Sequence, residues 1–106
     1  MHALLQSQGI HHITLNGADR NASIKFWRDI LGMKLIFEQP NLDDDNENHL
    51  YFDCGDGRTV TVFTNELRVG QKEPISNSVG SVHHLAFWVS QSTLKVAEKK
   101  LKGKIR

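Results

Sequence analysis

A five-residue phrase occurs twice in this chain, and the repetition constrains the fold more than any other feature. His11–Leu15 (HHITL) near the start matches His83–Phe87 (HHLAF) near the end, 72 positions later. A run with apolar residues at helical spacing follows each copy, and the glycines that end these runs, Gly32 and Gly103, lie 71 positions apart. Two phrases and two helices that keep nearly one offset predict a duplicated strand–helix unit.

The first copy reads as one strand, one helix and three further strands. Period-two alternation of apolar residues predicts the strands, and apolar residues on one face of a 3.6-residue period predict the helix. We expect Asp19 or Asn21 to cap the start of the helix and Gly32 to end it in a left-handed conformation. Asp56-Gly57, within the segment 54–57, predicts a hairpin. The expected elements are a strand at 10–15, a helix at 23–31, and strands at 33–38, 49–53 and 58–64.

The second copy begins after a connector at 67–80 that contains glycine, proline and serine. Val82–Val89 alternates as a strand, and Ser90 or Ser92 is expected to cap the following helix, which Gly103 ends. Residues 1–106 therefore read as a single α+β domain. A complete first module occupies 9–66, and a second module, at 81–106, contains only its strand and helix.

Composition excludes several function classes. The 106 residues carry a net charge of +1 and are 39% hydrophobic, values that indicate a globular domain and not a nucleic-acid-binding surface. No apolar run is long enough to span a membrane. Cys54 is the only cysteine, so no internal disulfide can form, and we expect a reducing, cytoplasmic location.

Strand parity decides between the two histidines of each pair. A helix needs an apolar sheet face to pack on, so Ile13 must face the first helix, and His12 must point to the opposite, uncovered face. The same reasoning places His84 on the uncovered face of the second strand. His11 and His83 then lie on the helix side, near the rim. Because both copies give the same answer, His12 and His84 are the candidate metal ligands.

Two neutral imidazoles from separate strands suit a first-row divalent metal. Parity adds His49 and Tyr51 to the uncovered face, where they are candidates for proton transfer or substrate positioning. Trp88 is a candidate for stacking on an aromatic substrate. A plainer interpretation stands beside each: histidines hydrogen-bonded at a strand start, polar residues on a solvated face, and a tryptophan in a cavity wall or an interface.

The segments 9–15, 23–35 and 83–89 resemble the vicinal oxygen chelate superfamily, which includes glyoxalase I, fosfomycin- and bleomycin-resistance proteins and extradiol ring-cleaving dioxygenases. The resemblance covers residues 9–103. It implies paired βαβββ modules whose curved sheet forms a cup around a metal, with His12 and His84 as ligands. Glyoxalase I-like enzymes place a glutamate ligand on the fourth strand, whereas this chain has Val62 there. The resemblance therefore favours the three-ligand pattern of the dioxygenases and fosfomycin-resistance enzymes.

The third ligand implied by the resemblance is a glutamate on the last strand of the second module, and this sequence ends before that strand. We expect 106 residues to be a piece of a longer chain with about 25–35 more residues, judged from ordinary strand lengths; a naturally short chain is the alternative. The open sheet edge favours association, so we expect a homodimer.

The activity that the resemblance implies is that of an extradiol dioxygenase, in which Fe(II) or Mn(II) binds two neighbouring oxygens of a small catechol- or hydroquinone-like substrate. A glyoxalase-like isomerase, lyase or thiol transferase with Ni(II), Zn(II) or Mn(II) is the second interpretation. A non-catalytic small-molecule-binding module, similar to antibiotic-resistance proteins, is the third. No interpretation involves nucleic acid or a membrane.

Overall fold

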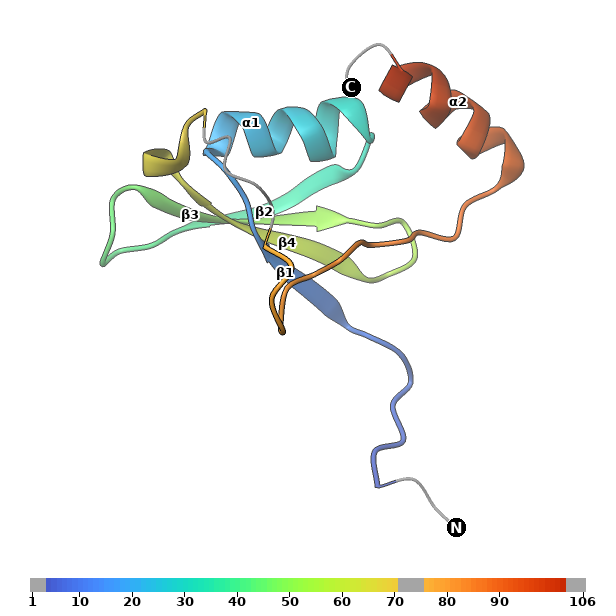
Figure 1. Ribbon diagram of the computed structural model, residues 1–106, viewed down its shortest axis with the longest axis horizontal. Coiled ribbons are helices and arrows are strands. Elements are labelled where there is room, and N and C mark those ends of the chain that lie inside the picture. Colours follow the sequence, from blue (N-terminus) through green and yellow to red (C-terminus); the bar gives the residue numbers. More distant parts are fainter. Residues whose placement is uncertain (1–3, 71–75, 103–106) are drawn as a thin grey trace. The chain divides into compact units, whose positions relative to one another are not determined.

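A computed structural model describes residues 4–70 and 76–102, which belong to two compact units, 1–70 and 71–106. The first unit contains a four-stranded mixed sheet with the strand order β1-β4-β3-β2 (Figure 1). β1 runs parallel to β4, and the other neighbours are antiparallel. The strands are β1 (His12–Asn16), β2 (Lys34–Pro40), β3 (Glu47–Asp53) and β4 (Thr59–Asn65). The four predicted strands of the first module are confirmed, with boundaries shifted by one or two residues.

The connection from β1 to β2 is helical and lies on one face of the sheet (Figure 1). It begins as α1 (Arg20–Ile24) and continues as the π-helical η1 (Lys25–Ile30). The Asp19 side chain caps the start, because its Oδ2 accepts a hydrogen bond from the Ala22 amide at 3.2 Å. Gly32 ends the helix with φ of +79°, as predicted. The helix therefore starts three residues earlier than the apolar pattern indicated.

The core lies between this helix and the sheet. Leu50 and Phe52 of β3 are completely buried, and the Trp27 ring lies 6.2 Å from that of Phe52. Fully burying side chains of this size stabilises a fold by about 1.5–3 kcal/mol each. The predicted helix-facing parity of β3 is therefore confirmed. The buried apolar residues are Ile24, Leu50, Phe52, Val60 and Val62.

The turn after β1 depends on a glycine that allows close packing. A Cβ at Gly17 would lie 2.6 Å from Val62 Cγ1 and 3.0 Å from Ser23 Oγ. The Gly17 amide donates a hydrogen bond to the Phe63 carbonyl at 2.8 Å, so the turn is held against β4. The chain therefore passes from β1 into the helix directly over the core.

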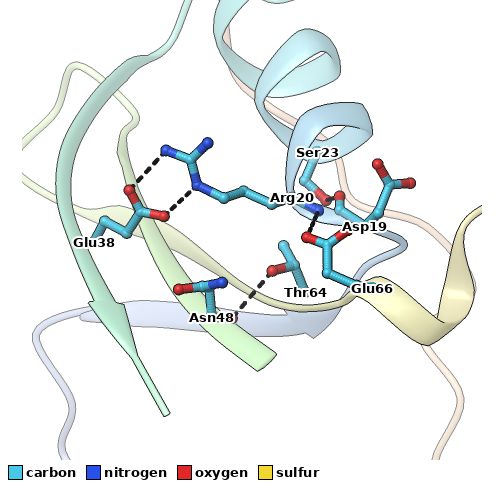
Figure 2. Close-up of polar contacts among 7 residues, drawn as sticks. All are labelled: Asp19, Arg20, Ser23, Glu38, Asn48, Thr64 and Glu66. Atoms are coloured by element: carbon cyan, nitrogen blue, oxygen red, sulfur yellow. Dashed lines mark hydrogen bonds and ion pairs between the residues drawn. The ribbon is translucent and has the colours of Figure 1, made fainter. Parts of the chain in front are cut away.

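An ion pair that sequence patterns did not predict joins the start of α1 to β2 (Figure 2). The Arg20 guanidinium binds both carboxylate oxygens of Glu38: Nη2 lies 2.9 Å from Oε1, and Nε donates to Oε2. The Arg20 amide also donates to Glu66 Oε1 at 3.3 Å. The hydrogen bond from Arg20 lowers the pKa of Glu38 and the same contact raises that of Arg20. This bidentate pair fixes the helix against the sheet.

The loops of the first unit follow their local turn chemistry. β3 and β4 pair antiparallel on either side of residues 54–58, which confirms the predicted hairpin. Gly55 and Gly57 in this loop have φ of +91° and +85°. In the loop between β2 and β3, Asn41 Oδ1 accepts a hydrogen bond from the Asp43 amide, and Asp44 Oδ1 accepts one from the Asn46 amide, each at 2.9 Å. These side chains shape the turn.

In the second unit the helix is confirmed and the strand is not. α2 spans Gln91–Lys102, and Ser90 caps its start, because the Ser90 Oγ accepts a hydrogen bond from the Thr93 amide at 3.1 Å. The predicted strand at 82–89 is wrong: within the described ranges these residues pair with no strand, and an extended segment without a partner leaves its backbone groups unsatisfied. The prediction that Gly103 ends this helix lies outside the described residues. The chain thus has an α+β fold with a mixed four-stranded sheet.

Candidate functional site

The face of the sheet opposite α1 gathers polar side chains from three adjacent strands. Thr14 of β1 is paired with Thr61 of β4, which is paired with Tyr51 of β3. Because Leu50 and Phe52 point into the core, the alternate residues His49 and Tyr51 point to the open face. The predicted placement of these two residues is therefore confirmed.

A continuous chain of hydrogen bonds connects four side chains on this open face. Thr14 Oγ1 lies 2.6 Å from Thr61 Oγ1, which lies 2.9 Å from His49 Nε2. The other ring nitrogen of His49, Nδ1, lies 3.0 Å from the Tyr51 hydroxyl. Sequence reasoning missed both threonines. The available signal was strand parity. Thr14 lies two residues after His12, and Thr61 lies in the middle of the fourth expected strand, at 58–64.

The His49 ring is held on its face as well as at its edges. It stacks on Phe63 with the ring centroids 4.0 Å apart and an interplanar angle of 15°. Burial lowers the pKa of His49, the nearby His12 lowers it further, and Glu47 opposes them. His49 is therefore a neutral imidazole near pH 7, with one nitrogen able to accept a proton.

The two histidine pairs share one local geometry although they lie in different units. His11 Nδ1 is 2.9 Å from His12 Nδ1, and His83 Nδ1 is 2.8 Å from His84 Nδ1. The ring centroids are 5.1 Å apart in both pairs, and the rings are close to perpendicular, at 84° and 77°. All four side chains are exposed. The repetition seen in the sequence therefore extends to the conformation of the pairs.

These pairs have donor chemistry that fits a divalent metal. A histidine ligand is usually oriented by a hydrogen bond to the ring nitrogen that does not bind the metal, and the Nδ1 contact fills that role here. It leaves Nε2 of His12 and of His84 for coordination. No group of three metal-ligating side chains forms among residues 4–70 and 76–102, so the third ligand is not located.

The remaining predicted site residues, His12, His84 and Trp88, differ in their placement. His12 opens β1, so its strand parity can be applied, whereas His84 lies in a segment that pairs with no strand among residues 4–70 and 76–102. The Trp88 side chain is fully exposed within its unit. Its role against a substrate stays a prediction.

A pocket of about 330 Å³ lies at one end of the open face, within the size range of small-molecule sites. His49 and Phe63, whose rings are stacked on each other, both line this pocket. A small ligand in this pocket would contact the edge of the hydrogen-bonded chain. The lining residues are Gln39, Pro40, Asn41, Leu42, His49 and Phe63.

No helix in the part of the chain that the structure describes is both long and apolar enough to cross a membrane.

Comparison with known proteins finds a family profile, described as Glyoxalase/Bleomycin resistance protein/Dioxygenase superfamily, that matches residues 9–93. A relative from Bacillus subtilis (strain 168), named "Putative ring-cleaving dioxygenase MhqE", is 29% identical over an alignment that covers 93% of this chain and 36% of that protein.

Solved structures show the same fold. A Bacillus subtilis protein described as a "putative dioxygenase" superposes with a TM-score of 0.74 at 27% identity, covering 92% of this chain and 31% of the other. The fosfomycin resistance protein FosX from Listeria monocytogenes, solved with Mn(II) and sulfate, superposes with a TM-score of 0.65 at 16% identity. The superposition covers 92% of this chain and 72% of the FosX chain. The chain thus spans about a third of the length of the Bacillus relatives that it matches.

Proposed function

Because this chain belongs to the Glyoxalase/Bleomycin resistance protein/Dioxygenase superfamily, we propose that it is a metal-dependent enzyme domain most like an extradiol ring-cleaving dioxygenase. The observation that carries the proposal is the open face of the sheet, where His12 stands on the same side as the hydrogen-bonded His49 and Tyr51. The names of the Bacillus relatives support ring cleavage as the reaction.

His12 and His84 would hold the metal through Nε2. Fe(II) or Mn(II) suits a site of two histidines and one carboxylate. The Mn(II) in FosX is consistent with a metal in this fold. The metal would serve as a Lewis acid and a template for two neighbouring oxygens of the substrate and for O₂. The carboxylate is not among the ligands that the described residues bring together.

The residues of the chain would bind the substrate and move its proton. His49 and Tyr51 lie within hydrogen-bond distance of each other and can take a proton from a catechol or hydroquinone hydroxyl. We infer that the pocket beside His49 and Phe63 accommodates part of a small vicinal-oxygen substrate. Trp88 would then stack on its ring.

The glyoxalase-like alternative needs a carboxylate on β4. Val62, at the expected position, is 1% exposed and packs in the core on the helix side. Thr59, Thr61, Phe63 and Asn65 are the β4 residues with the opposite parity, and none carries a carboxylate. This arrangement favours the dioxygenase-like pattern over the glyoxalase-like one.

Metal content and oxygen uptake test the proposal together. We expect the purified protein to bind Fe(II) or Mn(II), and His12→Ala and His84→Ala to abolish that binding. His11→Ala and His83→Ala are the comparison variants, because each keeps the proposed ligand but removes the imidazole that orients it. They should weaken metal binding about 10–100-fold without abolishing it. Oxygen consumption with catechols would identify a dioxygenase, and metal binding without it would favour an isomerase. A metal-free protein whose small-molecule binding is unchanged in His12→Ala and His84→Ala would refute both enzymatic functions.

A further inference from the structure

We propose that Tyr51, His49, Thr61 and Thr14 form a directional proton relay, in which the Tyr51 hydroxyl contacts the substrate and His49 receives the proton through it. Three consecutive hydrogen bonds of 3.0, 2.9 and 2.6 Å connect these side chains in that order. The inference rests on the proposed function for the substrate. The relay itself is a property of the chain, and it assigns different roles to two residues that the sequence could not tell apart.

The protonation state of His49 fixes the direction of the relay. A neutral imidazole has one donor and one acceptor nitrogen, so only one of its two hydrogen bonds can have the ring as donor. A phenol hydroxyl is a stronger donor than an aliphatic one, so Tyr51 donates to Nδ1. His49 Nε2–H then donates to Thr61 Oγ1, and the Thr61 hydroxyl donates to Thr14 Oγ1. His49 is therefore held as the Nε2–H tautomer.

This direction leaves the lone pairs of the Tyr51 oxygen for a substrate hydroxyl. In the transfer step, the substrate O–H bond breaks and a new Tyr51 O–H bond forms, while the former Tyr51 proton moves to His49 Nδ1. The products are a substrate oxyanion and an imidazolium, so charge and protons balance. His49 acts through Tyr51 and is a positioning residue and proton acceptor, since both its nitrogens are occupied.

The two threonines hold the imidazole ready for this step. Thr61 is 1% exposed, so its hydroxyl has little competition from water, and its contact with Thr14 fixes which way it points. The ring of His49 cannot rotate without losing its stack on Phe63 and both hydrogen bonds. Side chains preorganised in this way lose little entropy when the proton moves. Thr14 and Thr61 are thus positioning residues on two strands that contribute no acid or base.

Nitrogen-15 NMR of the histidine rings tests the relay in the metal-free chain, without any assay of activity. We expect wild-type His49 to be one neutral tautomer, protonated at Nε2. Thr61→Val removes the acceptor of that proton without changing the side-chain volume, and should shift the tautomer ratio about fivefold towards Nδ1–H, the value of one ordinary hydrogen bond. Tyr51→Phe removes the donor to Nδ1 and should produce a similar shift.

Two variants keep the test interpretable. Thr59→Val is the matched control, because Thr59 has the same strand and parity as Thr61 but no part in the chain of hydrogen bonds, and it should leave the ratio unchanged. Thr61→Ser restores a hydroxyl and should restore the wild-type ratio, which separates the hydrogen bond from packing. An even mixture of tautomers in the wild type, an Nδ1–H ring, or a ratio unaffected by Thr61→Val would overturn the relay. A confirmed relay in a protein that binds no metal would refute only the proposed function.

Discussion

Replacing Gly17 by alanine should destabilise the first unit through a single clash. The new Cβ would lie 2.6 Å from Val62 Cγ1, a distance that forces one of the two to move. Val62 is 1% exposed and Ser23, at 3.0 Å, is held by a 2.9 Å hydrogen bond from its Oγ to the Asp19 carbonyl, so neither neighbour has free space. Overpacking of this kind costs about 1–3 kcal/mol of the free energy of unfolding.

The measurement is thermal and urea unfolding followed by the fluorescence of Trp27, which packs against Phe52 in this unit. We expect the melting temperature of Gly17→Ala to fall by about 4–8 °C for each kcal/mol lost, as for other domains of this size. Trp88 belongs to the other unit and is fully exposed, so it contributes a constant background.

A double-mutant cycle identifies the clash as the cause. Val62→Ala alone should cost about 2 kcal/mol, because it removes buried methyl groups and leaves a cavity. In the double variant the missing methyl groups leave space for the Cβ introduced at position 17, so the combined cost should be smaller than the sum by at least about 0.5 kcal/mol. A Gly17→Ala protein as stable as the wild type, or strictly additive costs, would refute the reasoning.

Two further predictions concern charged and titratable groups. Glu38→Gln should lower the free energy of unfolding by about 1 kcal/mol near pH 7, because it breaks a partly exposed bidentate pair with Arg20. The pKa of Glu38 is lowered in the folded protein, so the contribution of the pair is lost as acid protonates the carboxylate. The difference in urea midpoint between wild type and variant should therefore shrink in acid. The folded protein lowers the pKa of His49, so below pH about 6.5 the unfolded chain takes up a proton that the folded chain does not, and stability falls with falling pH. His49→Gln should weaken that fall between about pH 7.5 and 5.5, whereas an equally steep fall would contradict the assignment.

The faces of the strands could be predicted from the sequence because they depend only on a period of two and on the position of the helix. Leu50 and Phe52 had to be buried together, and His49 and Tyr51 therefore had to share the opposite face. Glycine and aspartate at the ends of α1 and η1 were equally readable, since caps are local. The effect of a residue on its own backbone can therefore be predicted from its type and its spacing from neighbouring residues.

Contacts between distant segments could not be predicted in this way. The hydrogen bond between His49 and Thr61 depends on the register of β3 and β4. The ion pair between Arg20 and Glu38 depends on how α1 packs against β2. Neither quantity follows from the pattern of one segment. The strand predicted at 82–89 failed for a related reason: its alternation is correct for a strand, but a strand also requires a neighbour that the pattern does not supply.

The two histidine pairs show how these levels combine. Adjacent side chains in a regular strand point to opposite faces, so a contact of 2.8–2.9 Å between their Nδ1 atoms is favoured where the first residue lies outside the ladder. His11 directly precedes β1, and His83 and His84 lie outside the sheet, in agreement with this requirement. The shared geometry is therefore set by the local sequence and not by the sheet. His12 is selected as a ligand by this geometry and by its place in a ladder, whereas His84 is selected by the geometry alone, which makes the His84→Ala and His83→Ala pair the sharper test of the proposed metal site.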